Sequence, residues 1–186
     1  KYIVLEDLSY KVTKPCIMDL KMGCRQRSAR HSPVKRLKMV AKAELTTSAA
    51  LGFRMCGMQC YDAETGTLKF YDKYWGQRIT LDAMSQALSL FLLGDLQGEP
   101  DPCRRELWED LLRKMIEMLG RLRRVVQELN GLRFWSGSLL LGFDAAHFEG
   151  NRREELLDSV QLKMIDFAHF ADVGGDRPDE EYLCGV

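Results

Sequence analysis

The feature that most constrains the fold is a long helical pattern between residues 101 and 131. Asp101 is a suitable N-cap, and Pro102 suits the first position of a helix. Asn130 and Gly131 are typical of the residues that end a helix. Between them, apolar side chains recur at helical spacing, at Leu107, Leu111, Leu112, Met115, Ile116, Leu119, Leu122, Val126 and Leu129. Such a one-sided apolar stripe has to be buried against a second layer of structure.

Two shorter helices are expected before this one. Residues 33–52 follow Ser32, a plausible N-cap, and begin with Pro33. A second helix is expected from Thr80 to Leu93. Because 46% of the 186 residues are hydrophobic, the chain can form one domain with a substantial core.

Strand patterns occur on both sides of the helices. The expected strands are residues 2–8, 16–23, 52–62, 68–76, 132–144 and 160–170. The two middle segments are separated by a turn and are expected to form a hairpin. Strands, a helix, a hairpin, two helices and two more strands follow one another. This order predicts an α+β fold, an antiparallel sheet with packed helices, rather than alternating βαβ units.

The charges are distributed unevenly, although the formal net charge is zero. Zero net charge gives no whole-chain argument for binding to nucleic acid or a membrane. Residues 20–43, however, contain no Asp or Glu and eight basic residues: Lys21, Arg25, Arg27, Arg30, Lys35, Arg36, Lys38 and Lys42. A segment this basic usually binds a polyanion or forms a large solvated face.

The cysteines and the apolar runs exclude other classes. There are six cysteines, no Cys-x-x-Cys pair and no signal-peptide pattern, so thiols of a reducing compartment are expected rather than disulfides or structural zinc. No apolar run approaches the roughly 18 residues that a membrane span needs, so none is expected.

Three charged residues lie within apolar strand patterns. Asp19 and Lys21 share one face of the strand 16–23, because side chains two residues apart point to the same side. Asp166 ends an apolar strand, where a carboxylate is costly unless a positive group meets it. The Asp-Phe pair here is similar to the Asp-Phe-Gly of protein kinases, which holds Mg²⁺. The alternative is an aspartate that caps the next turn.

Several motifs in order make the pattern specific. Pro15, Asp19, Lys21 and Gly23 form Pro-x-x-x-Asp-x-Lys-x-Gly, followed by "RFWSGSLL" and then "MIDFAH". Together they resemble the inositol polyphosphate kinase family over nearly the whole chain, and most of all the inositol hexakisphosphate kinases. The trisphosphate 3-kinases and the multikinases are more distant resemblances. The resemblance implies a protein-kinase-like or ATP-grasp-like C-terminal lobe, ATP and Mg²⁺ as cofactors, and an inositol polyphosphate as substrate, with a pyrophosphate formed on inositol hexakisphosphate.

The resemblance also implies roles for single residues. Asp19 would orient or deprotonate the acceptor hydroxyl, and Lys21 would meet the transferred phosphoryl group and a substrate phosphate. Asp166 would hold Mg²⁺ at the nucleotide phosphates, with Ser138 near both. His169 would face the substrate phosphates or the nucleotide, and the alternative is a partly buried structural histidine.

The basic segment gains a candidate ligand from the same resemblance, because several Lys and Arg must converge on a compact polyphosphate. The expected substrate-binding residues are Lys21, Arg25, Lys35, Lys38 and Lys42, of which the last three share one side of the helix. The alternative is a solvated basic helix. Nucleic acid is disfavoured as a partner, because residues 21–42 lack interleaved aromatic side chains.

The N-terminal segment is expected to bind the nucleotide base. Backbone groups of Glu6, Asp7 and Leu8 would meet adenine. Residues 1–14 would then be a hinge strand from a smaller N-terminal lobe that the family carries, and residues 15–186 the C-terminal catalytic lobe, with the basic segment 21–42. The expected location is the cytoplasm or the nucleus.

Some features depart from the family pattern. Cys24 stands where the hexakisphosphate kinases usually carry threonine, and Gly137 replaces the first of two adjacent serines. The connection 144–160 is short, and the N-terminal lobe is expected before Lys1. These departures leave a second hypothesis open, a non-catalytic module that binds polyphosphate.

Overall fold

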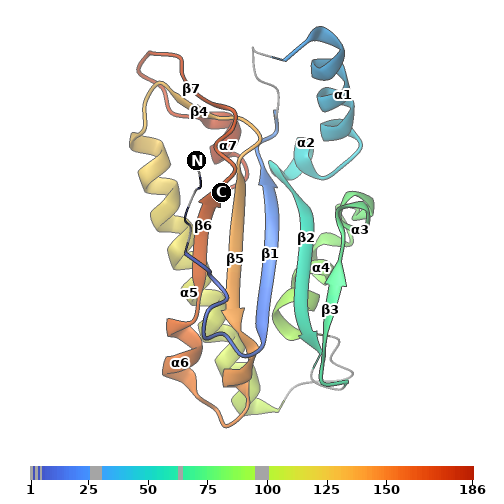
Figure 1. Cartoon of the computed structure of the whole chain (residues 1–186), viewed down its shortest axis with the longest axis vertical. Helices are drawn as coiled ribbons and strands as arrows, with labels where there is room; N and C mark the ends of the chain where they lie inside the picture. The colour runs from blue at the N-terminus through green and yellow to red at the C-terminus, as the bar shows by residue number, and fades with distance from the viewer. Residues whose placement is uncertain (1, 3, 5, 26–30, 63–64, 95–100) are drawn as a thin grey trace.

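The computed structural model of the chain describes residues 2, 4, 6–25, 31–62, 65–94 and 101–186. Its centre is a five-stranded sheet in the order β3-β2-β1-β5-β6, and every neighbouring pair is antiparallel (Figure 1). The strands are β1 (Pro15–Met22), β2 (Phe53–Asp62), β3 (Thr67–Tyr71), β5 (Ser138–Asp144) and β6 (Gln161–Ile165). The expected α+β class, an antiparallel sheet with packed helices, is confirmed.

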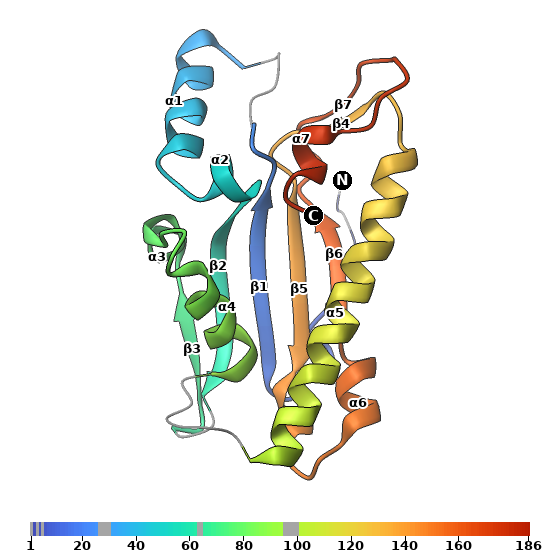
Figure 2. The same ribbon diagram turned by 180° about the vertical axis from the view of Figure 1, so that it is seen from behind.

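Helices cover one face of this sheet. Figure 2 shows α4 (Met84–Leu93) and α5 (Pro102–Glu128) lying across it from behind. Strand β1 turns every second side chain toward them, so Cys16, Met18, Leu20 and Met22 are buried while the residues between are half-buried. This core face holds most of the predicted helical stripe, including Leu107, Leu111, Met115 and Val126. Leu112 and Ile116 lie at the edge of the stripe and are 45% and 59% exposed.

Helix starts follow the predicted caps. The Ser32 hydroxyl accepts a hydrogen bond from the Lys35 N–H, and the Asp101 carboxylate accepts one from the Arg104 N–H at 3.0 Å. The helix expected over 33–52 is nevertheless two helices, α1 (Pro33–Glu44) and α2 (Ser48–Leu51). Between them the Thr47 hydroxyl donates to the Phe53 carbonyl at 2.8 Å, an alternative to helical hydrogen bonding that ends the run.

Two expected elements near the hairpin were wrong in part. Residues 73–78 form helix α3 (Lys73–Arg78) instead of extending the strand, because the Asp72 carboxylate accepts hydrogen bonds from the N–H groups of Tyr74 and Trp75. Helix α4 begins at Met84, so residues 80–83 lie outside the helix expected from Thr80.

The strands expected over 132–144 and 160–170 are each interrupted. The first consists of β4 (Leu132–Phe134) and β5, with Ser136 at φ 60° between them. The second consists of β6 and β7 (Phe170–Asp172), with Asp166 at φ 64° between them. Strands β4 and β7 pair as a separate two-stranded sheet beside α7 (Glu180–Leu183).

The buried Asp179 fastens α7 to this small sheet. Its carboxylate accepts hydrogen bonds from the Phe134 N–H at 2.7 Å and from the Tyr182 N–H at 3.1 Å. At the opposite end of the large sheet lie a 3-10 turn (Ala145–Phe148) and α6 (Arg153–Asp158). None of the described helices is long and apolar enough to cross a bilayer.

The other face of the large sheet, here called the open face, is crossed by residues 6–14 (Figure 1). The strand expected over 2–8 is wrong for the described residues, which form no strand, and residues 8–11 form a turn. The Asp144 carboxylate holds this segment by accepting hydrogen bonds from the N–H groups of Thr13 at 2.7 Å and Lys14 at 2.8 Å. The Gln161 amide donates to the Leu8 carbonyl at 3.0 Å. The segment therefore lies against β5 and β6 rather than joining the sheet as a strand.

Candidate active site

An apolar floor lies between the N-terminal segment and the open face. Ile17 on β1 pairs with Gly142 on β5, and Leu140 is the next β5 residue on the same side. With Leu8 and Val12 above them, these residues line a shallow, mostly apolar pocket with a cavity volume of about 20 Å³. An apolar lining edged by backbone groups suits contact with one side of a flat aromatic ring.

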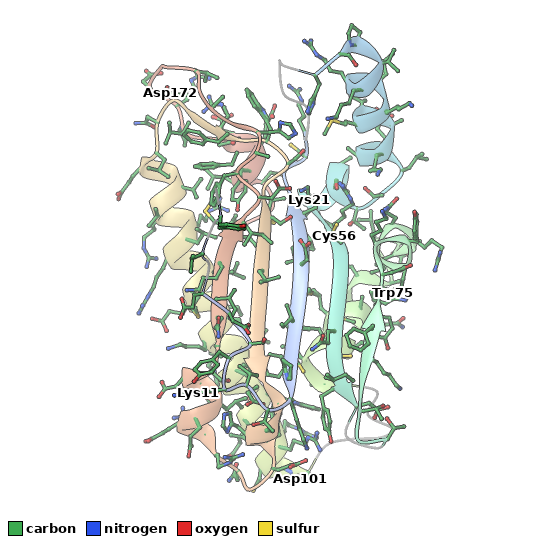
Figure 3. The ribbon with its side chains drawn as sticks, in the orientation of Figure 1. Lys11, Lys21, Cys56, Trp75, Asp101 and Asp172 are labelled. Carbon is green, nitrogen blue, oxygen red and sulfur yellow. The ribbon has the colours of Figure 1, made fainter. Side chains whose placement is uncertain are left out.

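Polar side chains follow on the same face, toward the end of β1 that points to α1. Lys21 pairs with Ser138 on β5, and Ser138 pairs with Ile165 on β6. Asp166 comes next after β6. The Lys21 ammonium and the Asp166 carboxylate meet at 2.7 Å, and Figure 3 shows Lys21 near the upper end of β1. The strand order β1-β5-β6 thus brings together residues from three separate motifs.

The side chain of Asp19 is partly buried in this site. Burial raises the pKa of Asp19, although a hydrogen bond with Ser138 and the charge of Lys21 oppose the shift. Its Oδ1 is buried and has no hydrogen-bond partner among the described residues. A buried carboxylate oxygen without a donor is costly, so this atom is suited to accept a proton or a hydroxyl hydrogen bond from a ligand.

Asp166 has the opposite character. The hydrogen bond from Lys21 lowers the pKa of Asp166 against a small effect of burial, so the group is ionised at neutral pH. Its backbone at φ 64° lies in the left-handed region, which Asp tolerates better than most residues. The Asp166 side chain is about half-exposed and lies outside the core. It extends past β5 to reach Lys21 on β1.

These residues fit a magnesium ion held mainly by a nucleotide. No cluster of three or more His, Cys, Asp or Glu side chains with metal-ligating geometry occurs in the described part of the chain. Mg²⁺ usually keeps several waters and binds through one or two carboxylates plus substrate phosphates. Asp166 supplies such a carboxylate. Ser138 is 2% exposed and its side chain hydrogen-bonds Asp19, so it lies beside the carboxylates rather than open to solvent.

Basic residues extend the site beyond the end of β1. Arg25 forms an exposed ion pair with Glu181 of α7 at 3.2 Å. Lys35, Lys38 and Lys42 are exposed on α1, and none of the three has an ion-pair partner among the described residues. Unpaired like charges on one side of a helix repel one another, and a bound polyanion would remove that cost.

Two histidines join α1 to the segment after β6. The Nε2 atoms of His31 and His169 are 3.3 Å apart, and the rings meet edge to face with centroids at 4.5 Å. His31 is buried, which lowers its pKa, and the charges of Lys35, His169 and Arg36 act in the same direction. His169 therefore has a defined protein partner as well as a position near the site.

The residues expected to bind adenine have distinct positions. Leu8 lines the apolar pocket, and its carbonyl accepts the hydrogen bond from Gln161. Glu6 and Asp7 are exposed, and the Asp7 carboxylate accepts hydrogen bonds from the N–H and hydroxyl of Ser9, which lower its pKa. Of the three, Leu8 has the most direct contact with the pocket.

Comparison with known proteins decides the family. The family model described as inositol polyphosphate kinase matches residues 2–186. The chain belongs to the inositol polyphosphate kinase family. Inositol hexakisphosphate kinase 2 of Rattus norvegicus is 34% identical over 91% of the chain and 44% of that protein. Inositol hexakisphosphate kinase 3 of Homo sapiens is 32% identical over the whole chain and 49% of that protein. The chain thus spans about half the length of these relatives.

Solved structures of the family share the fold. The inositol phosphate multikinase from S. cerevisiae, solved with ADP and Mn²⁺, superimposes with a TM-score of 0.79 at 25% identity, covering 97% of this chain and 77% of that one. A second inositol phosphate multikinase gives a TM-score of 0.80 at 25% identity, covering 98% and 80%. The expected family and its kinase-like fold are confirmed.

One basic residue of this kinase-family site was missed by sequence reasoning. Arg54 on β2 pairs with Lys21 on β1, is 6% exposed, and donates a hydrogen bond to the Ser48 hydroxyl at 3.0 Å. Its positive charge also acts on Asp19. A charged residue inside the apolar run "GFRMCGM" was the available signal, because buried arginines almost always have a specific partner.

Proposed function

We propose that this chain contains the substrate- and metal-binding lobe of an ATP- and Mg²⁺-dependent kinase that phosphorylates an inositol polyphosphate. Inositol hexakisphosphate, with formation of a pyrophosphate, is the acceptor we favour, because the most similar relatives include proteins named for that acceptor. The observation that carries the proposal is the meeting of Asp19, Lys21 and Asp166 at one end of the open face, beside an apolar pocket and below a basic helix.

The order of groups along the open face supports the binding mode. Adenine would lie over Ile17, Leu140 and Gly142, with backbone groups of residues 6–8 at its edge. The phosphates would then extend toward Lys21 and Asp166. Magnesium, when bound, would neutralise the nucleotide phosphates, and Asp166 with Ser138 nearby would hold it.

The protein's own groups would then act on the acceptor. Asp19, whose pKa is raised by burial, would accept the proton of the attacking oxygen or orient it. Lys21 would exchange part of its contact with Asp166 for the transferred phosphoryl group, since an ammonium is a compact, mobile point charge. Arg25, Lys35, Lys38, Lys42 and His169 would hold the other substrate phosphates.

The test is a transfer assay with labelled ATP and a panel of inositol phosphates from trisphosphate to hexakisphosphate. The full-length protein is compared with its Asp166→Asn variant and with Asp158→Asn, a matched change at an exposed carboxylate on α6. We expect transfer to at least one acceptor, a loss of at least roughly hundredfold in Asp166→Asn, and no change in Asp158→Asn. Transfer to no acceptor, with ATP bound normally, would refute the proposal.

The same panel separates two other functions. Preference for a trisphosphate or tetrakisphosphate would assign the multikinase type of activity, which the two structural neighbours favour. Tight binding of inositol hexakisphosphate with no transfer and no effect of Asp166→Asn would assign a non-catalytic polyphosphate-binding module.

A further inference from the structure

Helix α1 exposes apolar side chains at regular spacing on one side. Val34, Leu37 and Leu45 are 63%, 72% and 82% exposed. Ala41 is exposed as well. Positions 34, 37, 41 and 45 are three or four residues apart, and Leu45, the C-cap, keeps αR backbone angles, so these side chains share one face of the helix. This set is called the outer stripe, and contiguous exposed apolar surface of this kind marks an interaction site.

The opposite side of α1 faces the rest of the protein. Met39, Val40 and Ala43 line a cavity of about 220 Å³ together with Cys24 and Arg25, which follow β1. The main neighbour of α1 among the described elements is the short helix α2. Figures 1 and 2 show α1 at one end of the molecule, beyond the ends of β1 and β2. The outer stripe is therefore left uncovered by the described part of the chain.

The charges beside the outer stripe are almost all positive. Lys35, Lys38 and Lys42 lie along one flank of the stripe. All three are exposed and have no ion-pair partner among the residues that the structure describes. Glu44, in the last turn, is the only acidic residue of α1. A partner that fits this helix should therefore combine an apolar phase with negative charge.

Helix α5 provides the comparison within the same molecule. Ile116 on α5 is 59% exposed, similar to Val34. Arg113, one turn before Ile116, forms ion pairs with both Glu109 and Asp110. Helix α1 differs in that its exposed apolar side chains lie beside unpaired cations.

We propose that the outer stripe docks the protein on an anionic lipid membrane surface. A basic helix with apolar residues on one face lies in the plane of a bilayer interface, with the apolar side chains at the acyl boundary and the lysines at the headgroups. Lysine suits this position because its apolar stem follows the bilayer surface while the ammonium reaches the phosphates. With 12 residues, α1 is too short to cross a bilayer, so the docking is adsorption at one surface.

The cations decide which lipid is bound. Each basic residue near an anionic membrane strengthens adsorption through electrostatic attraction, and a zwitterionic membrane provides no such attraction. The outer stripe has no role in the candidate active site, whereas the three lysines are also expected to bind substrate phosphates. The proposal therefore goes beyond the proposed function, and its tests change the stripe and leave the lysines in place.

Sedimentation with vesicles measures the docking of the full-length protein. Vesicles of phosphatidylcholine are compared with vesicles of phosphatidylcholine and phosphatidylserine in equal parts. We expect binding to the anionic vesicles and little binding to the neutral ones. The double variant Val34→Ser, Leu37→Ser should bind at least roughly tenfold more weakly, because two aliphatic side chains no longer leave water. The control Ile116→Ser, at a similarly exposed position on α5, should bind as the parent does.

A tryptophan in the outer stripe reports the same contact directly. Leu37→Trp keeps an apolar side chain, so this variant should bind anionic vesicles as the parent does. Its additional fluorescence, taken as the difference from the parent, should shift to shorter wavelength on binding. Lipids brominated in the acyl chains should quench it. The added fluorescence of Ile116→Trp should show neither change.

Several outcomes would overturn the proposal. Absence of binding to anionic vesicles would refute it. Equal binding of the parent and the double serine variant, or an unquenched Leu37→Trp, would show that the lysines alone attract the vesicles. A concentration-dependent dimer that the double variant abolishes would assign the stripe to a second copy of the chain. Circular dichroism checks the fold, and if the double variant unfolds, the Leu37→Trp fluorescence decides. A failed kinase assay would refute the proposed function and leave these results standing.

Discussion

Replacing Asp144 with alanine should detach the N-terminal segment from the sheet and destabilise the whole chain. Asp144 is 2% exposed, and its carboxylate accepts hydrogen bonds from the N–H groups of Thr13, Lys14 and Ala146 at 2.7, 2.8 and 2.9 Å. Burial alone would raise the pKa of Asp144, but these three donors outweigh it and leave the pKa lowered. The residue therefore joins the end of β5 to the segment that covers the apolar pocket.

The magnitude follows from the three bonds. A hydrogen bond to a charged acceptor contributes about 1.5–3 kcal/mol, but the N–H groups of Thr13 and Lys14 are only partly buried and can recover water as a partner. We therefore expect a loss of about 3–4 kcal/mol in the free energy of unfolding. With a urea slope of about 2 kcal/mol per M, the unfolding midpoint should fall by roughly 1.5–2 M.

Urea denaturation followed by circular dichroism measures this change, with Asp158→Ala as the control. Asp158 is exposed at the end of α6, so the same substitution there should change the free energy of unfolding by less than about 0.5 kcal/mol. A loss below about 1 kcal/mol in Asp144→Ala would mean that the three hydrogen bonds do not hold the segment, and the reasoning would be wrong.

The same variant carries a pH signature. Because the folded-state pKa of Asp144 is depressed, its contribution to stability is present above the unfolded value of about 3.9 and is lost as the pH falls through the folded value. The difference in stability between the parent and Asp144→Ala should accordingly be constant near neutral pH and shrink below about pH 4. A difference that instead grew on acidification would contradict the assigned sign.

Three further predictions concern the site and its support. Burial raises the pKa of Asp19, so the rate of phosphoryl transfer should fall on acidification at a pH above the roughly 3.9 of an ordinary aspartate; a pH–rate profile with its acid limb at or below that value would contradict this. Lys21→Met should lower the rate of phosphoryl transfer by at least roughly hundredfold. The melting temperature should change little, because the Lys21–Asp166 ion pair is partly exposed. A large fall in the melting temperature would show that Lys21 has a structural role instead. Gly52→Ala should destabilise the chain by more than about 2 kcal/mol in thermal unfolding. Gly150→Ala has a similar positive φ but no atom within 4 Å of the added Cβ, so it should cost only about 1 kcal/mol. Equal losses in the two variants would show that the backbone conformation, and not the close packing, sets the cost.

The parts of the fold that local periodicity controls were predictable. Strand β1 and helix α5 have the alternation and the apolar stripe that their sequences indicate, and Ser32 and Asp101 begin helices as expected. Asp72 begins a helix as well, because its carboxylate accepts hydrogen bonds from the N–H groups of Tyr74 and Trp75, although the run 68–76 was predicted as strand. A short helix that interrupts a β pattern depends on one cap and on packing against β2, which periodicity over a longer window does not detect.

The interruptions at the site had a different origin. The predicted strand 160–170 breaks at Asp166, whose φ of 64° carries its carboxylate toward Lys21. Asp166 does end the apolar run in the sequence, but the partner that its carboxylate meets is known only from the tertiary structure. Arg54 was missed for a related reason, since its position beside Lys21 depends on the pairing of β1 with β2.

The sequence by itself determined the family, the helix caps, the buried faces of β1 and α5, and the residue types that the chemistry needs. Each of these depends on neighbours within a few residues or on motifs that are linear in the chain. Only the tertiary structure decided that Lys21 and Asp166 meet, because they are 145 positions apart and the antiparallel order β1-β5-β6 is what brings them to 2.7 Å. It also decided that the backbone at Gly52 meets the segments at Gly23 and Gly185, which is possible because glycines let backbones approach more closely than any side chain would allow.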